Sequence, residues 1–260
     1  MAGDSMIAGL LHTVPALAPT FDALVAAAVA GTSREHVVDA WMLETAIAEG
    51  VTPAVRERVA SHLRHLAESG ADAILVTCSS IGEAAEEAAA DLAVPVIRVD
   101  AAMAAEAARL AADSTGAPAR IAVLATNTAT LGPTTRLIER EAAAQGVRAT
   151  VTATVVEGAA AARAEGDQAT HDRLIADAVR AAATPADGDA AAALVLAQAS
   201  MAPAAESAGV DIPVLTSPAG GVARLAEALT PSDPGTPDAS ANRAAAPGSG
   251  GTLAATEATS

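Results

Sequence analysis

The chain has 260 residues, with 31 acidic and 15 basic side chains, a formal charge of −16 and a hydrophobic content of 52%. These values are typical of an acidic, soluble globular protein. Every basic residue is arginine, and lysine is absent from the whole sequence. This excludes a Schiff-base lysine, a phosphate-loop lysine and a lysine general base, so any catalysis depends on Cys, His, Ser, Thr, Asp, Glu or Arg.

Composition also argues against macromolecular partners. The negative charge repels phosphate backbones, and Phe21 and Trp41 are the only Phe, Trp or Tyr residues on which bases could stack. The apolar runs Ala23–Ala30 and Ala101–Ala112 are shorter than the roughly 18 residues that indicate a membrane span. We therefore expect no nucleic-acid partner and no membrane partner.

The single cysteine, Cys78, cannot form an intramolecular disulfide. Residues 1–5 contain no basic region ahead of an apolar stretch, so no signal peptide is predicted. His62 and His65 have no third candidate ligand nearby, and we expect no metal site. These features predict a cytoplasmic protein.

Short apolar runs alternate with alanine-rich helical stretches along most of the chain, which is the pattern of an α/β protein with parallel strands. From Thr230 onward Pro, Gly, Ser and Thr dominate, and residues 231–260 are predicted to be a disordered tail. The expected strands are, in chain order, Met6–Leu11, Ala73–Thr77, Val94–Val99, Arg120–Ala125, Thr150–Val156, Ala192–Ala197 and Ile212–Leu215.

Three of these runs recur later in the chain at nearly one spacing. Residues 6–13 resemble 120–127 at an offset of 114, residues 73–81 resemble 193–201 at 120, and residues 94–97 resemble 212–215 at 118. The repetition predicts two pseudo-symmetric lobes, each a parallel sheet flanked by helices. We assign 1–100 plus 211–230 to the first lobe and 101–210 to the second.

Parallel sheets bind ligands beyond the carboxyl ends of their strands, so two facing lobes would enclose a small molecule between their loops. The loops in question are 12–15, 77–81, 126–130 and 198–201. The sequence thus predicts an active site between the lobes.

Cys78 ends an expected strand and precedes the helical stretch Ile81–Leu92. The helix dipole at that point lowers a thiol pKa and favours a reactive thiolate, although a buried structural cysteine fits the same pattern. Ser79 and Ser80 at the helix start can hold a carboxylate, act as helix caps, or do both.

His12 follows the first strand, at the same sheet edge as Cys78, where a Cys–His pair could serve as acid, base or nucleophile. A hydrogen-bonded loop histidine is the plain alternative. Thr126, Asn127 and Thr130 supply neutral donors between a strand and a helix that we expect to begin near Gly132, which suits an anion-binding loop.

The sequence resembles the aspartate/glutamate/hydantoin racemase superfamily over roughly residues 6–228. The resemblance implies two pseudo-symmetric α/β lobes, an active site between them and no cofactor. In the racemases two cysteines, one from each half, remove and return a proton on opposite faces of the substrate. The matching motifs are Gly9-Leu10-Leu11-His12-Thr13, Leu75-Val76-Thr77-Cys78-Ser79-Ser80-Ile81-Gly82, Val94-Pro95-Val96-Ile97-Arg98-Val99-Asp100, Val123-Leu124-Ala125-Thr126 with Thr130, and Val195-Leu196-Ala197-Gln198-Ala199-Ser200-Met201.

Within this resemblance Cys78 matches the first cysteine, and His12-Thr13 occupy the place of a common Asp-Ser pair that helps to manage the cysteine's proton. Gln198 stands where the second cysteine would be. A glutamine amide neither gives nor takes a proton at accessible pKa values, so two-base racemisation is not expected. The superfamily also contains single-cysteine decarboxylases and isomerases whose cysteine adds to a double bond.

We therefore expect an isomerase or lyase that acts on a small carboxylate or related carbonyl compound through Cys78. An arylmalonate-decarboxylase-like lyase and a non-catalytic binding protein are the alternatives, and a homo-oligomer is left open. His12 would set the thiolate, and Gln198 would polarise a carbonyl or orient a water. The predicted substrate-binding residues are Thr13, Ser79, Ser80, Thr126, Asn127, Thr130, Ala199 and Ser200.

Overall fold

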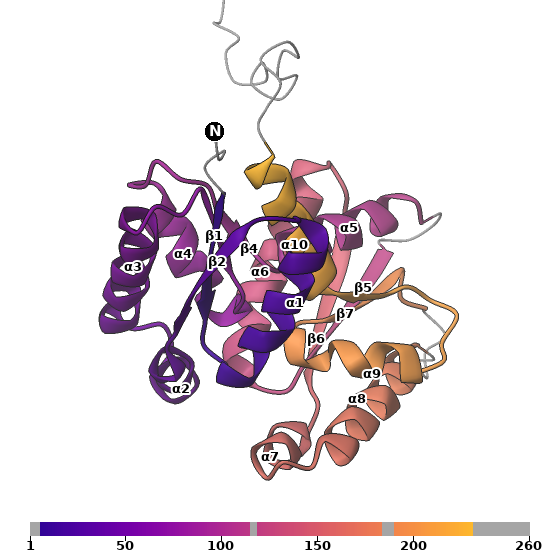
Figure 1. Cartoon of the computed structure of the whole chain (residues 1–260). Coiled ribbons are helices and arrows are strands. Elements are labelled where there is room, and N and C mark those ends of the chain that lie inside the picture. The colour runs from indigo at the N-terminus through magenta and orange to yellow at the C-terminus, as the bar shows by residue number, and fades with distance from the viewer. Residues whose placement is uncertain (1–5, 115–118, 184–189, 231–260) are drawn as a thin grey trace, which may run out of the picture. The chain divides into compact units, whose positions relative to one another are not determined.

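Two parallel sheets of four strands each organise the chain (Figure 1). The computed structural model describes residues 6–114, 119–183 and 190–230. The first sheet has the order β2-β1-β3-β4 and the second the order β6-β5-β7-β8. The strands are β1 (Ile7–His12), β2 (Ser33–Val38), β3 (Ala73–Val76), β4 (Val96–Arg98), β5 (Ala119–Ala125), β6 (Ala149–Val155), β7 (Ala193–Leu196) and β8 (Val214–Thr216).

The central strands are apolar because helices cover both faces of each sheet. All residues of β3 and β7 are buried, as expected for parallel strands covered on both sides. The helices are α1 (Ala18–Ala28), α2 (Ala40–Glu49), α3 (Pro53–Glu68), α4 (Gly82–Ala89), α5 (Ala101–Ala112), α6 (Thr128–Ala144), α7 (Ala159–Ala164), α8 (Gln168–Ala183), α9 (Ala202–Ser207) and α10 (Ser217–Leu229), with short 3-10 turns η1 (Pro15–Leu17), η2 (Ser79–Ile81) and η3 (Ala199–Met201).

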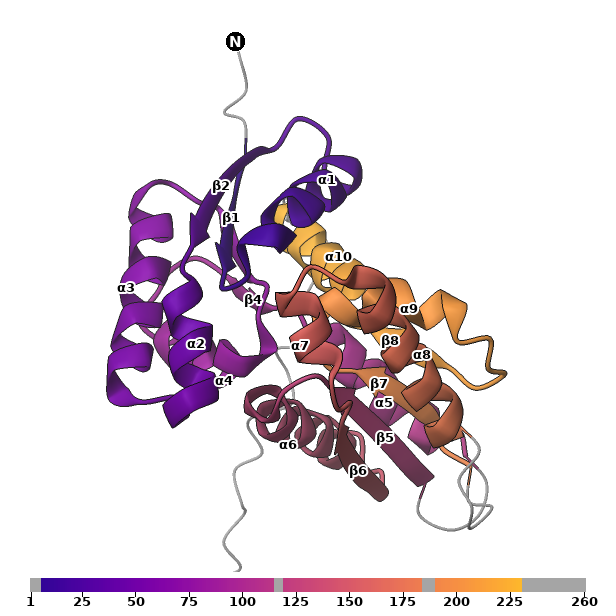
Figure 2. The same cartoon turned by 90° about the horizontal axis from the view of Figure 1, so that it is seen from below.

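Each sheet has one core on either face. Figure 2 shows α3 and α4 on one side of the first sheet and α1 and α10 on the other, and both pairs bury apolar side chains against its strands. In the second sheet α5 and α6 cover one face, and α7, α8 and α9 cover the other. The predicted α/β class with two parallel-sheet lobes is confirmed.

The C-terminal segment is divided between the two sheets. We expected 211–230 in the first lobe, but β8 pairs with β7 of the second sheet, so that expectation is wrong for residues 214–216. Helix α10 does pack on the first sheet, where Val222 and Leu225 join the same core as Leu10 and Leu75. Helix α10 therefore returns from the second sheet to pack against the first.

Strand β2 is the element that the sequence did not reveal. Its six residues include Ser33, Arg34, Glu35 and His36, and no residue in it is fully buried. An edge strand of this composition gives no apolar run and no strict alternation. The internal repeat did contain the signal, because the expected strand Thr150–Val156 lies about one repeat further along the chain, and β6 holds the equivalent edge position.

The expected tail, 231–260, lies outside the described residues. Within the described ranges, no helix is both long and apolar enough to cross a bilayer. The helix expected to begin near Gly132 begins at Thr128 and contains Pro133 within its first two turns. Thr130 therefore lies on a helix and not in a loop.

Candidate functional site

A small pocket lies where loops from the carboxyl ends of both sheets meet. It holds about 380 Å³ of empty space, part of which is open to solvent. No charged side chain lines this pocket among the described residues. The polar groups that face a bound molecule are therefore one thiol, several hydroxyls and one amide. The lining residues are Thr13, Val14, Leu17, Leu43, Thr77, Cys78, Ser79, Ser80, Thr130, Gln198, Ala199 and Ser200.

Cys78 and Gln198 hold equivalent positions in the two lobes. Each follows the third strand of its sheet and directly precedes a 3-10 turn, η2 or η3, that leads into a helix. Their backbones match closely, with φ −126° and ψ 116° at Cys78 and φ −123° and ψ 136° at Gln198. Because both residues line one pocket, the structure places Gln198 where pseudo-symmetry would place a second thiol.

The surroundings of Cys78 act on its proton in two opposing ways. Burial raises the pKa of the thiol above its ordinary value, whereas the Thr13 hydroxyl, the backbone N–H groups of Ser80 and Ile81 and the Ser80 hydroxyl each lower it. Burial is the largest effect. The expectation that the helix start gives a lowered pKa is therefore wrong: the N–H groups act in the expected direction, but desolvation outweighs them, and the resting thiol is neutral.

Thr13 contributes a hydroxyl to the pocket, beside the Cys78 thiol. The residue is 2% exposed, and its Oγ1 has no hydrogen-bond partner of normal geometry within the described part of the chain. A buried hydroxyl without a partner is costly, so such groups usually meet a ligand or a water. Thr13 therefore offers a buried hydroxyl beside Cys78 to a molecule bound in the pocket.

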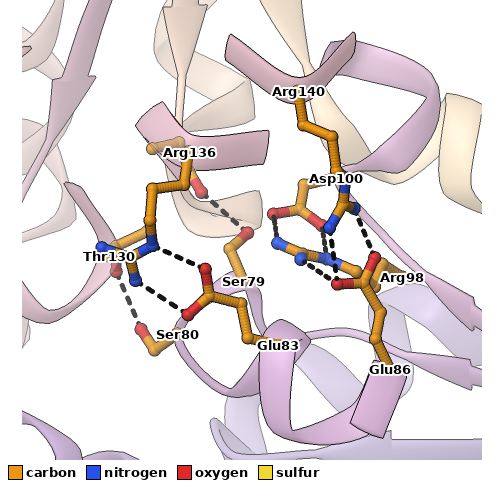
Figure 3. A network of polar contacts seen from close by, with 10 residues as sticks. Ser79, Ser80, Glu83, Glu86, Arg98, Asp100, Thr130, Arg136 and Arg140 are labelled. Atoms are coloured by element: carbon orange, nitrogen blue, oxygen red, sulfur yellow. Dashed lines mark hydrogen bonds and ion pairs between the residues drawn. The ribbon is translucent and has the colours of Figure 1, made fainter. Parts of the chain in front are cut away.

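Three other predicted substrate-binding hydroxyls already donate to protein atoms. Ser79 Oγ donates to the carbonyl of Ala197 at 3.0 Å. Thr130 Oγ1 donates to Asn127 Oδ1 at 3.1 Å, so the 2.9 Å contact between Ser80 and Thr130 must have Ser80 as its donor (Figure 3). Two of these bonds join the first lobe to the second. These three hydroxyls line the pocket, but their protons are already used in hydrogen bonds to other protein atoms.

Gln198 is held by the loop that follows β5. Its side-chain Oε1 accepts a hydrogen bond from the backbone N–H of Thr126 at 2.6 Å. Since that partner is a donor, the amide orientation is fixed and the NH₂ group is the part of Gln198 left for other contacts. Thr126 and Asn127 do not line the pocket; they hold Gln198 and Thr130, which do.

His12 also lies behind the pocket wall. It is fully buried, and its Nδ1 is 2.9 Å from the hydroxyl of Thr77, which does line the pocket. Burial first, and then the neighbouring His36, lower the pKa of His12 to about 4. His12 is therefore neutral near pH 7, and it reaches the pocket through Thr77.

Sequence reasoning missed His36 and Asp22. His36 lies on β2, the strand that was not predicted, and its Nδ1 is 3.0 Å from Nε2 of His12. On its other side Nε2 of His36 is 3.1 Å from Oδ1 of Asp22. Prediction of a strand at Ser33–Val38 would have placed His36 on the strand next to β1, which ends at His12 and itself pairs with the strand that precedes Cys78.

A frame of ion pairs lies beside Ser79 and Ser80, the residues that follow Cys78 (Figure 3). Arg98 is 3% exposed in its side chain and binds fully buried Asp100 through two N–O contacts of 2.9 Å. On α4, Glu86 accepts from both Arg98 and Arg140, so α4 is joined to helix α6 of the other lobe. A second pair, Glu83–Arg136, joins the same two helices, with N–O distances of 2.7 and 2.8 Å.

Gly82 makes room for this frame at the start of α4. A Cβ at Gly82 would lie 2.5 Å from Nε of Arg98, closer than real contacts allow. The glycine therefore lets the buried guanidinium pass beneath the turn that follows Cys78. No group of three or more His, Cys, Asp or Glu side chains in the described ranges is arranged to hold a metal ion.

Fold and pocket together define a two-lobed α/β protein whose pseudo-equivalent loops enclose one cysteine. The family model for Asp/Glu/Hydantoin racemase matches residues 5–225. The chain belongs to the Asp/Glu/hydantoin racemase family.

Solved structures show the same fold. Glutamate racemase RacE1 from Bacillus anthracis is 19% identical with a TM-score of 0.61, covering 87% of this chain and 82% of its own. Aspartate racemase from Picrophilus torridus is 13% identical with a TM-score of 0.59, covering 86% and 94%. The Gly74Cys mutant of arylmalonate decarboxylase is 20% identical with a TM-score of 0.52, covering 85% and 93%. None of the curated protein sequences compared with the chain matches it.

The buried Arg98–Asp100 pair can be tested by stability. Asp100→Asn should lower the free energy of unfolding by about 3 kcal/mol, because it removes the fully buried anion of the Arg98 guanidinium and leaves only the partly exposed Glu86 to balance that charge. The matched control is Glu106→Gln, which removes an exposed ion pair with Arg109 and should cost less than about 1 kcal/mol. Urea denaturation measures both. Equal losses in the two variants would contradict the structural role given to Arg98.

The neutral state of Cys78 can be tested by alkylation. A thiol with a raised pKa has little thiolate at pH 7, so iodoacetamide should modify Cys78 at least about tenfold more slowly than an exposed cysteine, and faster as pH rises. The reference is Ser69→Cys in a Cys78→Ala background, because Ser69 is exposed on the same chain. Faster modification of Cys78 than of that reference at pH 7 would show an activated thiolate instead.

Proposed function

We propose that this chain is a cofactor-independent isomerase or lyase that acts on a small carboxylate or related carbonyl compound through Cys78 alone. The observation that supports this most is the pairing of Cys78 with Gln198 at equivalent positions of one neutral pocket. A thiol can exchange a proton with a carbon acid, whereas an amide cannot. Proton transfer is therefore confined to the Cys78 side of the bound molecule.

Neutral donors would bind the carboxylate. With a net charge of −16 the surface opposes an anion at long range, so attraction must come from groups within the pocket. The Thr13 hydroxyl, beside Cys78, and the Gln198 NH₂ group are the donors for this carboxylate, because Ser79, Ser80 and Thr130 already donate their protons to protein atoms. Ala199 and Ser200 complete the wall on the side of the second lobe.

The neutral state of the Cys78 thiol favours a lyase over an isomerase. A neutral thiol is ready to give a proton, as is needed when a carbanion forms after loss of carbon dioxide. The structural likeness to arylmalonate decarboxylase is compatible with this reading. Addition of sulfur to a double bond, as in an isomerase, requires the thiolate, so another group would first have to remove the proton from Cys78.

Turnover and binding can be separated with Cys78 variants. Small mono- and dicarboxylates are first screened by thermal shift, since a ligand at 100 times its Kd stabilises by about 2.7 kcal/mol. For any compound that the wild type converts, Cys78→Ala should lose about 10²- to 10⁴-fold in kcat while still binding. Cys78→Ser should be nearly as poor, because a hydroxyl gives up its proton far less readily.

Two results would contradict the proposal. Full turnover by Cys78→Ala would move the chemistry to another residue. Tight binding of a carboxylate without turnover by the wild type would favour the alternative, a binding protein that kept the cleft.

A further inference from the structure

A continuous chain of side chains connects the pocket wall with the protein surface. It begins at Thr77, runs through buried His12 to His36, whose side chain is 24% exposed, and ends at Asp22, which is 44% exposed. The three successive contacts measure 2.9, 3.0 and 3.1 Å. Every link joins two groups that can pass a proton, and the inner end lies next to Cys78 in the sequence and in the same pocket.

The same heavy-atom positions satisfy two different proton arrangements. In the first, the Thr77 hydroxyl donates to Nδ1 of His12, Nε2–H of His12 donates to His36, and Nε2–H of His36 donates to the Asp22 carboxylate. In the second, His36 carries a second proton and donates to both neighbours. Nδ1–H of His12 then donates to Thr77, and the Thr77 hydroxyl donates to the carbonyl of Leu11, 3.1 Å away.

Both arrangements leave every group in this chain with a partner. The carbonyl of Leu11 also accepts from the backbone N–H of Thr77 at 3.0 Å, so it stays bonded when the hydroxyl turns away. Because no heavy atom has to move, the change costs only the transfer of protons along existing hydrogen bonds.

We propose that Thr77, His12, His36 and Asp22 form a proton relay between the pocket and solvent. The proposal deepens the proposed function, and its role in catalysis rests on that function: a single thiol with no partner across the pocket must have its proton removed or replaced from elsewhere in each cycle. His12, His36 and Asp22 act through Thr77 and are positioning residues in this scheme.

Removal of one proton from the pocket proceeds in balanced steps. A group in the pocket gives its proton to Thr77 Oγ1 as the Thr77 proton passes to Nδ1 of His12. The Nε2 proton of His12 passes in turn to Nδ1 of His36. The pocket group has then lost one proton, and His36 has become an imidazolium beside the Asp22 carboxylate. Delivery of a proton to the pocket is the reverse.

The surroundings suit a conducting role for His12. Phe21 packs against the His12 ring at a centroid distance of 5.9 Å and is fully buried, which keeps bulk water from the inner link. The rings of His12 and His36 are nearly parallel, 12° apart. The lowered pKa of His12, about 4, means that it passes a proton on and does not hold it as a stable cation near neutral pH.

The outer end is balanced between two charges. Asp22, on α1, lies at the outer end, with its Oδ1 3.1 Å from Nε2 of His36. Arg34, on β2, donates from Nε to the same carboxylate oxygen at 2.7 Å. The hydrogen bond from Arg34 and then that from His36 hold the pKa of Asp22 below its usual range, so the outer end of the chain is an anion near neutral pH.

Histidine tautomers provide the test, with no substrate needed. The full chain is labelled with ¹⁵N, and two-bond ¹⁵N–¹H correlation spectra are recorded from about pH 8 to about pH 5, the range in which histidines titrate. As His36 gains its second proton, His12 should change from the Nε2–H to the Nδ1–H tautomer at the same midpoint. A His12 tautomer that stays unchanged through the His36 titration would overturn the relay.

Three variants sharpen the result. His36→Gln keeps hydrogen-bonding groups but cannot relay a proton, so the tautomer change of His12 should disappear. Asp22→Asn keeps a hydrogen-bond acceptor beside His36 but removes its charge, so the His12 tautomer change should still coincide with protonation of His36. His62→Gln is the matched control, because His62 pairs with Asp39 at 2.7 Å in a similar way but does not line the pocket. It should leave the His12 change intact.

Failure of the relay and failure of the proposed function give different results. If His12 stays in one tautomer while Cys78→Ala loses turnover, the relay is wrong and the function stands. If His12 changes tautomer while Cys78→Ala keeps full turnover, the relay stands and the function is wrong.

Discussion

The pocket depends on the hydrogen bonds that join the Cys78 turn to the second lobe. Ser79 donates to the carbonyl of Ala197, the residue before Gln198, and Ser80 donates to Thr130 on α6. These short bonds bring Cys78 and Gln198 to one cavity. Ion pairs between α4 and α6 also join the two lobes, but exposed ion pairs add little stability. The buried hydrogen bonds of the two hydroxyls therefore fix the position of the Cys78 turn relative to the second lobe. The primary role of Ser79 and Ser80 is therefore to join the two lobes.

Charge is arranged around the pocket and not within it. Arginines pair with carboxylates along α4 and α6, and the lining of the cavity is neutral. Such an interior strengthens the interaction of each remaining dipole with an anion and keeps the thiol protonated. A neutral thiol opposite an amide suits chemistry in which one proton moves on one face, and that proton needs a route to water.

The sequence predicted those parts of the site that lie on regular, repeated elements. Buried strands β3 and β7 were evident as apolar runs. The offset of 120 between them identified Gln198 as the residue of the second lobe that is equivalent to Cys78. The sequence could not reveal how desolvation competes with the helix start at Cys78, since that depends on packing from both lobes. It also could not show that Ser79 and Ser80 donate across the lobes. His36 was missed because its strand is polar and at the edge.

The central claim is that protons reach the bound molecule from the Cys78 face alone. The most direct measurement is the stereochemical course of deuterium incorporation in D₂O, for a chiral substrate that the enzyme is found to bind and exchange. Wild type should incorporate deuterium with retention of configuration, and Gln198→Cys should add inversion because it supplies a second thiol. Rapid racemisation by the wild type would contradict the account, since another residue would then have to serve the opposite face.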